Sequence, residues 1–124
     1  MGKIVSMPGG PERRAKVRHP VDSTAAIILV NGGERFSGRI QDVSLDGCRI
    51  RSDQPFPAGV YIKVETEFWL VGSTFQLGGV VQMICDRLLV GIRFLDLDAG
   101  ERQQLVALIA EIERLQAVAA QLRS

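Results

Sequence analysis

The stretch "RFSGRIQDVSLDGCRIRS" (residues 35–52) contains the pattern that decides the fold. Its first half alternates apolar and polar side chains, which is typical of a strand with one buried face. The letters "SLDG" then interrupt the alternation with residues that favour a turn. Alternation resumes in "CRIRS" (48–52), which predicts a second, shorter strand with one face buried and one in water.

The same kind of pattern continues on both sides of this stretch. Upstream, "STAAIILVN" is apolar and β-branched and "NGGE" is a tight-turn signal, which predicts a hairpin of strands 25–31 and 34–43 with a bend or bulge at Gly38. After the loop "DQPFPAG", the segment "VYIKVET" (60–66) alternates with its valines and isoleucine on one face. "STFQLGGVVQMIC" and "LLVGIRFLD", joined by "DR", predict another hairpin with a bulge at Gly78–Gly79.

These strands and the last quarter of the chain together predict the fold class. Six short strands with no helix between them indicate an all-β core, a small six-stranded antiparallel β-barrel rather than a parallel sheet. The end of the chain changes to a helical period, and Asp98 with Glu101 three residues later forms a capping-box pattern. The sequence therefore predicts a long C-terminal α-helix after the barrel.

The predicted helix is longer than the barrel can cover. About 25 residues at about 1.5 Å each make about 37 Å of helix, whereas a strand of ordinary length spans only ~17–20 Å. Apolar residues continue to the helix end at coiled-coil spacing: Leu105, Leu108, Ile112, Leu115, Ala119 and Leu122. We expect the second half, 112–122, to mediate self-association as a homo-oligomer. The alternative is a helix that plugs one barrel end and frays beyond it.

Composition places the chain among soluble globular proteins. Of its 124 residues 46% are hydrophobic and 23% charged, and no apolar run approaches the roughly 18 residues of a membrane span. The start "MGKIVSMPGG" lacks the features of a signal peptide, so a cytoplasmic location is expected. The predicted organisation is a flexible tail (1–11), the barrel with an N-terminal arm (12–97) and the helix (98–123). Cys48 and Cys85 are expected to be buried, reduced thiols.

Positive charge is concentrated at the N-terminal end. Residues 1–20 carry a formal charge of +4 and the remaining residues −3, which gives the net +1 of the chain. Duplex-binding proteins need a broader basic face, so the sequence does not indicate duplex nucleic acid as a partner. A few clustered cations suit one or two phosphates of a compact anionic ligand.

Two short motifs lie on either side of the first predicted hairpin. The first is an RxxxR pattern and the second is a DxSxxG turn: Arg14 and Arg18, then Asp42, Ser44 and Gly47. In this order, on a six-stranded barrel with a C-terminal helix, they resemble the PilZ domain family of bacterial cyclic di-GMP receptors. The resemblance covers roughly residues 12–105, and "VGIRFLD" looks like the last strand of the family.

The resemblance implies a binding role for each motif residue. Guanidinium groups at Arg14 and Arg18 suit both phosphate oxygens and guanine edges. Asp42 would accept hydrogen bonds from guanine N–H groups, and Ser44 would donate to a phosphate oxygen. Gly47 would be needed for a positive φ or for close approach of the ligand. Arg13 resembles a family position linked to the number of bound ligands, and we expect two ligands per site.

Other functions remain open at this stage. The sequence has one histidine and no recognisable catalytic, cofactor or metal motif, so an enzyme is not expected. The motifs also fit simpler structural roles, a solvated basic tail and a self-bonded β-turn. A single-stranded nucleic-acid barrel and a PilZ-type interaction scaffold that binds no nucleotide are the alternatives to a cyclic di-GMP receptor that signals to an unidentified effector protein.

Overall fold

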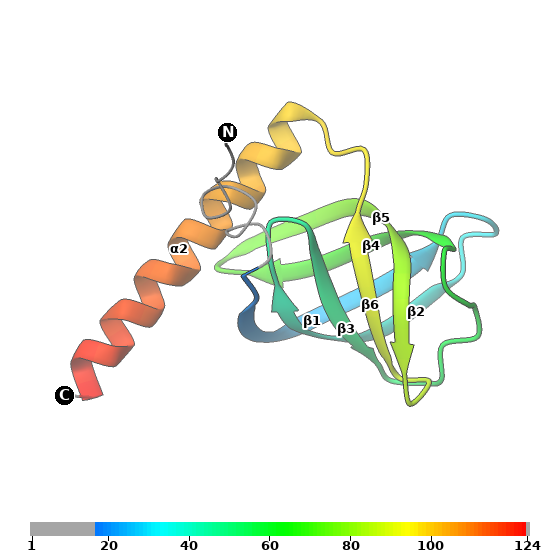
Figure 1. The fold of residues 1–124 in the computed structure, drawn as a ribbon, viewed down its shortest axis with the longest axis horizontal. Helices are drawn as coiled ribbons and strands as arrows, with labels where there is room; N and C mark the ends of the chain where they lie inside the picture. The colour runs from blue at the N-terminus through cyan, green and yellow to red at the C-terminus, as the bar shows by residue number, and fades with distance from the viewer. Residues whose placement is uncertain (1–16, 124) are drawn as a thin grey trace, which may run out of the picture.

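Six antiparallel strands close into a barrel in the order β1-β2-β3-β6-β5-β4 (Figure 1). The computed structural model describes residues 17–123. The strands are β1 (His19–Leu29), β2 (Arg35–Val43), β3 (Gly47–Ser52), β4 (Lys63–Leu70), β5 (Ser73–Cys85) and β6 (Leu89–Phe94). One helix, α2 (Ala99–Arg123), follows the barrel. The predicted six-stranded barrel with a C-terminal helix is confirmed.

The core forms because alternate strand residues point into the barrel. On β4, for example, Val64, Thr66 and Phe68 are almost completely buried, whereas Glu65 between them is exposed. Thr66 is the polar member of this series, and its hydroxyl donates to the Leu77 carbonyl oxygen over 2.8 Å. The interior is therefore closed by side chains and the outer wall carries the polar ones.

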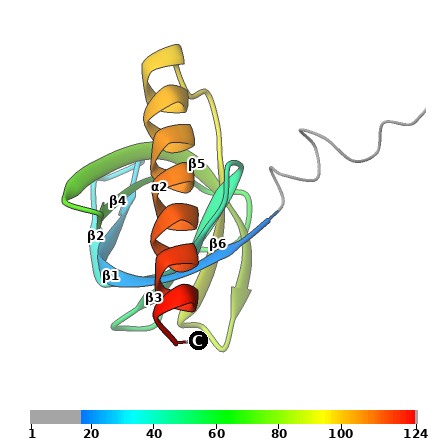
Figure 2. The ribbon, with the colours of Figure 1, turned by 90° about the vertical axis from the view of Figure 1, so that its left-hand side faces the viewer.

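Helix α2 packs on the barrel as far as Ile112 and Glu113, just past its middle. Asp98 and Glu101 form the predicted capping box, in which the Glu101 N–H donates to Asp98 Oδ1 (2.7 Å) and the Asp98 N–H to Glu101 Oε1 (3.0 Å). The buried helix residues end at Ile112. Beyond it the helix runs away from the barrel (Figure 1). Seen from the left-hand side of that view, the helix lies in front of the strands (Figure 2). Within residues 17–123, no helix has the length and hydropathy to cross a bilayer.

Two strand boundaries differ from the sequence prediction. β1 begins at His19 rather than at residue 25, because its first residues pair across to Val43 and Asp42 on β2. The predicted strand 60–66 starts only at Lys63, and of its predicted buried face Val64 is buried whereas Val60 and Ile62 are exposed. Tyr61 takes a positive φ of 67°, which ends regular pairing and leaves residues 60–62 exposed.

The predicted bulges are also misplaced. The register shifts between Ile40 and Asp42 on β2 and between Val81 and Met83 on β5, not at Gly38 or Gly78–Gly79. Gly38 instead allows a close strand approach, since a Cβ there would lie 2.1 Å from the Arg51 carbonyl oxygen.

The two cysteines differ, which corrects the expectation that both are buried. Cys48 is 1% exposed inside the barrel, whereas Cys85 is exposed at the end of β5, and both are free thiols. Burial, with a smaller contribution from the Asp42 carboxylate, raises the pKa of the Cys48 thiol far above its usual value.

We therefore expect one thiol per folded chain to react with an aromatic disulfide reagent. The thiolate is the reactive form, so Cys48 should react only after unfolding. Absorbance of the released thiolate measures both steps, and Cys85→Ser should remove the fast one. Rapid reaction of two thiols in the folded wild-type chain would contradict the burial of Cys48.

Candidate functional site

A buried carboxylate on the outer wall of the barrel holds two arginines. Arg49 Nε and Nη2 donate to Asp42 Oδ2 over 2.6 and 2.5 Å, and Arg18 Nη1 donates to the other oxygen over 3.2 Å. The Asp42 side chain is 8% exposed, whereas that of Arg18 is 53% exposed. Asp42 therefore anchors Arg18 while about half of the arginine side chain stays accessible.

A β-bulge places Asp42 in this position. Ile40 pairs with Ile50 inside the barrel, and the next pair, Asp42 with Arg49, follows after two residues on β2 but only one on β3. The extra residue, Gln41, turns the Asp42 side chain to the outer wall, where regular alternation would have kept it inside. Asp42 and Arg49 thus become cross-strand neighbours of opposite charge.

The residue after Arg18 fixes the end of the arm to the rest of the molecule. His19 is 6% exposed and begins β1. Its Nε2 lies 3.6 Å from Glu113 Oε2 on α2. Arg18 is therefore held from both sides, by its own bond to Asp42 and by its neighbour.

The predicted DxSxxG segment forms a tight turn that satisfies its own polar groups. The Ser44 N–H donates to the Gly47 carbonyl oxygen over 2.8 Å, and the Ser44 hydroxyl donates to Asp46 Oδ1 over 2.6 Å. Gly47 does not have a positive φ. It is required by a neighbouring strand instead, because a Cβ at Gly47 would lie 2.3 Å from the Ile92 carbonyl oxygen on β6.

A hollow of about 220 Å³ lies on the outer wall beside this turn. Its floor includes two glycines on neighbouring strands, Gly47 and Gly91, which carry no side chain to fill it. Its other lining residues are Arg18, Asp46, Cys48, Gln82, Met83, Ile92 and Arg93. The second bulge, after Val81, brings Met83 opposite Gly91 at the edge of this hollow.

The structure brings together part of the predicted site. Arg18 and Gly47 line the hollow, while Asp42 and Ser44 stand behind it and hold Arg18 and the turn. Arg13 and Arg14 lie outside the described residues. Arg49, the second partner of Asp42, was not predicted as a site residue. Its position on the solvent-facing side of the predicted strand 48–52, two residues after Gly47, could have indicated it. Met83, Gln82 and Arg93 were missed because no sequence pattern marked the β5 bulge.

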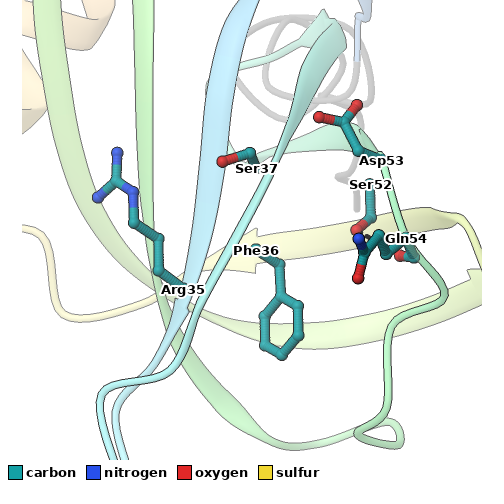
Figure 3. Close-up of a pocket in the computed structure, with 6 residues that line it drawn as sticks. All are labelled: Arg35, Phe36, Ser37, Ser52, Asp53 and Gln54. Atoms are coloured by element: carbon teal, nitrogen blue, oxygen red, sulfur yellow. Dashed lines mark hydrogen bonds between the residues drawn. The ribbon is translucent and has the colours of Figure 1, made fainter.

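A second cavity, of about 240 Å³, lies at the other end of β2 and β3. Figure 3 shows Phe36 between Arg35 on one side and Ser52 and Gln54 on the other. Arg35 is ion-paired with Glu67, and the Ser52 hydroxyl donates to the Gln54 carbonyl oxygen over 2.6 Å. These polar groups serve local structure, so this cavity is the weaker candidate for an anionic ligand.

The exposed aromatic side chains are not in the hollow. Tyr61 and Trp69 are 78% and 55% exposed, and neither lines it. The hollow therefore lacks, within the described residues, the aromatic platforms on which single-stranded nucleic-acid barrels stack bases.

The described chain is a small β-barrel domain: six antiparallel strands form a closed barrel, and one helix follows them. The hollow on its outer wall is lined by two arginines, Arg18 and Arg93. The family model described as PilZ domain matches residues 12–111, and the chain belongs to the PilZ family. Among curated proteins, no significant sequence match is found.

Three solved structures show the same fold. The PilZ domain with cyclic di-GMP of YcgR from Escherichia coli has a TM-score of 0.69 and 18% identity, over 88% of this chain and 98% of that one. The PilZ domain of CeSA from a cellulose-synthesizing bacterium has a TM-score of 0.67 and 14% identity, over 79% and 99%. The Bacillus subtilis inhibitor of motility MotI/DgrA has a TM-score of 0.65 and 15% identity, over 82% and 50%.

Proposed function

We propose that this chain is a cytoplasmic receptor for cyclic di-GMP, which binds in the hollow between the 44–47 turn and β6. The observation that carries the proposal is the anchoring of Arg18 by Asp42 at the edge of a hollow whose floor includes Gly47 and Gly91. Membership of the PilZ family and the likeness to the cyclic di-GMP complex of the YcgR PilZ domain support the choice of ligand.

Arg18 is prepared for an anionic ligand by its bond to Asp42. A guanidinium has five N–H donors, and the bond to Asp42 uses one Nη atom, so the other donors can meet phosphate or guanine oxygens. Holding the side chain in place reduces the conformational entropy lost on binding. Asp42 therefore acts as the residue that positions Arg18.

The hollow is too small to bind the ligand by itself. Pockets that enclose drug-sized ligands measure about 300–1,000 Å³, whereas this one measures about 220 Å³. We propose that it receives one part of the dinucleotide and that the N-terminal arm covers the rest. Arg14 is four residues before Arg18, so its Cα lies within about 14 Å of the Arg18 Cα and can reach over the hollow.

Binding is proposed to act by creating a new surface. When the arm closes over the ligand, the covered hollow and the arm together form a face that an effector protein reads, and the receptor needs no catalytic step of its own. The protruding part of α2 also supports the proposal that the chain forms a homo-oligomer, because Leu115, Val118 and Leu122 are exposed there.

Calorimetric titration tests this function directly. We expect cyclic di-GMP to bind the purified chain with two ligands per site, and Arg13→Ala to reduce the ratio to one, because a guanidinium at that position can stack on a second ligand. Oligothymidylate provides the comparison. Tighter binding of the oligonucleotide would favour a single-stranded nucleic-acid barrel, and no binding of either would favour the scaffold.

A further inference from the structure

A groove lies between α2 and the β4–β5 hairpin, away from the proposed ligand site. Its volume is about 240 Å³. The hairpin contributes Leu70, Val71, Ser73 and Phe75, and the first half of α2 contributes Gln104, Ala107, Leu108 and Glu111. The groove is thus a mainly apolar recess with a polar rim, beside the part of the helix that packs on the barrel.

The second half of α2 carries an uncovered apolar stripe on the same side of the helix. Leu115, Val118 and Leu122 are 43%, 41% and 82% exposed. At about 100° per residue they fall in line with Leu108 and Glu111, about a quarter turn from the side that faces the core. The stripe therefore continues the groove along the helix axis.

The turn of the β4–β5 hairpin holds an apolar residue at the groove despite an unfavourable backbone conformation. Val71 has a φ of 50°, followed by Gly72 at 76°. Turns of this kind favour asparagine, aspartate or glycine, and a β-branched residue there is a genuine outlier. Its side chain is 46% exposed and lines the groove, so the strained position supplies apolar surface at the opening.

We propose that a second copy of this chain covers both features, in an antiparallel two-fold pair of α2 helices where Leu122 of each copy enters the groove of the other. The groove lies along the barrel-proximal half of the helix and the stripe along the distal half. Only an antiparallel arrangement brings the distal half of one copy to the proximal half of its partner. With Leu115 at the two-fold axis, Leu122 lies opposite Leu108, and both are about 10 Å from the axis.

The charges beside the stripe are compatible with contact between identical surfaces. A two-fold interface places the same patch on both sides, so an unbalanced charge would face its own copy. Glu111 at the groove is ion-paired with Arg114 of the same helix, so their opposite charges cancel. This inference rests on the homo-oligomer proposed above and does not depend on nucleotide binding, which is tested separately by calorimetry.

Light scattering after size-exclusion chromatography, over a range of chain concentrations, tests the pair. We expect the wild-type chain to have twice the mass of one chain, and both Leu122→Asp and Val71→Asp to weaken dimerisation about 100-fold or more, since each would bury a charge. Aspartate suits the turn at position 71, so that variant should fold. Val106→Asp is the control, because Val106 is 51% exposed but lies on the opposite side of α2.

A mixing experiment tests the two sides of the proposed contact, Leu122 of one copy and the groove beside Val71 of the other, separately. Mixing Leu122→Asp with Val71→Asp leaves one intact groove and one intact Leu122 per pair, so the mixture should dimerise more strongly than either variant alone. A monomeric wild type would overturn the proposal. A dimer that depends on Leu122 but not on Val71 would also overturn it, in favour of a helix seam without the groove.

Discussion

Replacing Arg18 with alanine is expected to weaken cyclic di-GMP binding about 100-fold while lowering the free energy of unfolding by less than about 1 kcal/mol. The loss of affinity follows because Arg18 is the described cation of the RxxxR motif at the edge of the hollow. The small loss of stability follows because the Arg18 side chain is half-exposed and Asp42 keeps its two bonds to Arg49. Calorimetry and urea unfolding measure the two quantities on the same protein.

Arg39→Ala is the matched control for this prediction. The Arg39 side chain is 55% exposed, close to the 53% of Arg18, and also donates to a carboxylate, from Nε to Asp22 Oδ1 over 2.7 Å. Asp22 is 76% exposed, so Arg39 has the same charge and nearly the same exposure as Arg18 without a buried anchor. Arg39 does not line the hollow. We expect wild-type affinity in this variant. Equal losses in both variants would mean that general surface charge, rather than an anchored arginine, attracts the ligand.

The sequence was sufficient for the fold because each strand has its own apolar signal, either alternation or, in the first strand, a β-branched apolar run. Six strand segments and one helical segment were recognised, and the capping residues located the helix start. The start of β1 was missed because the pairing of Pro20 with Asp42 is a tertiary contact, and proline is a poor strand signal. Residues 60–62 were predicted wrongly because alternation alone does not reveal the positive φ of Tyr61.

The shape of the site was harder to predict than its motif residues. Glycines were interpreted as bulge signals, but Gly38 and Gly79 are needed where a neighbouring backbone comes close: a Cβ would lie 2.1 Å from Arg51 O and 2.5 Å from Arg93 O. The bulges beside the site add Gln41 and Gln82, residues with no special backbone preference, and a third register shift lies between Pro20 and Ser23 on β1. The positions of these bulges are set by the register between paired strands. The residues around a bulge in a single sequence therefore do not reveal it.

Gly47→Ala is expected to lower the free energy of unfolding by about 2 kcal/mol, a typical cost of overpacking a well-packed region. The new Cβ would lie 2.3 Å from the Ile92 carbonyl oxygen, which is backbone and cannot rotate away. Moving β6 would disturb the pairing of Gly47 with Arg93 and the bond from the Phe94 N–H to the Asp46 carbonyl oxygen (2.9 Å). Urea unfolding followed by the fluorescence of Trp69 measures the change.

Gly59→Ala separates this contact from the general effect of losing a glycine. A Cβ at Gly59 would meet nothing within 4 Å, and its φ is not positive, so we expect stability close to that of the wild type. In Gly47→Ala, affinity for cyclic di-GMP should fall together with stability, because β6 forms part of the floor of the hollow. If Gly47→Ala instead kept wild-type stability and lost only affinity, Gly47 would be required by the ligand and not by strand β6.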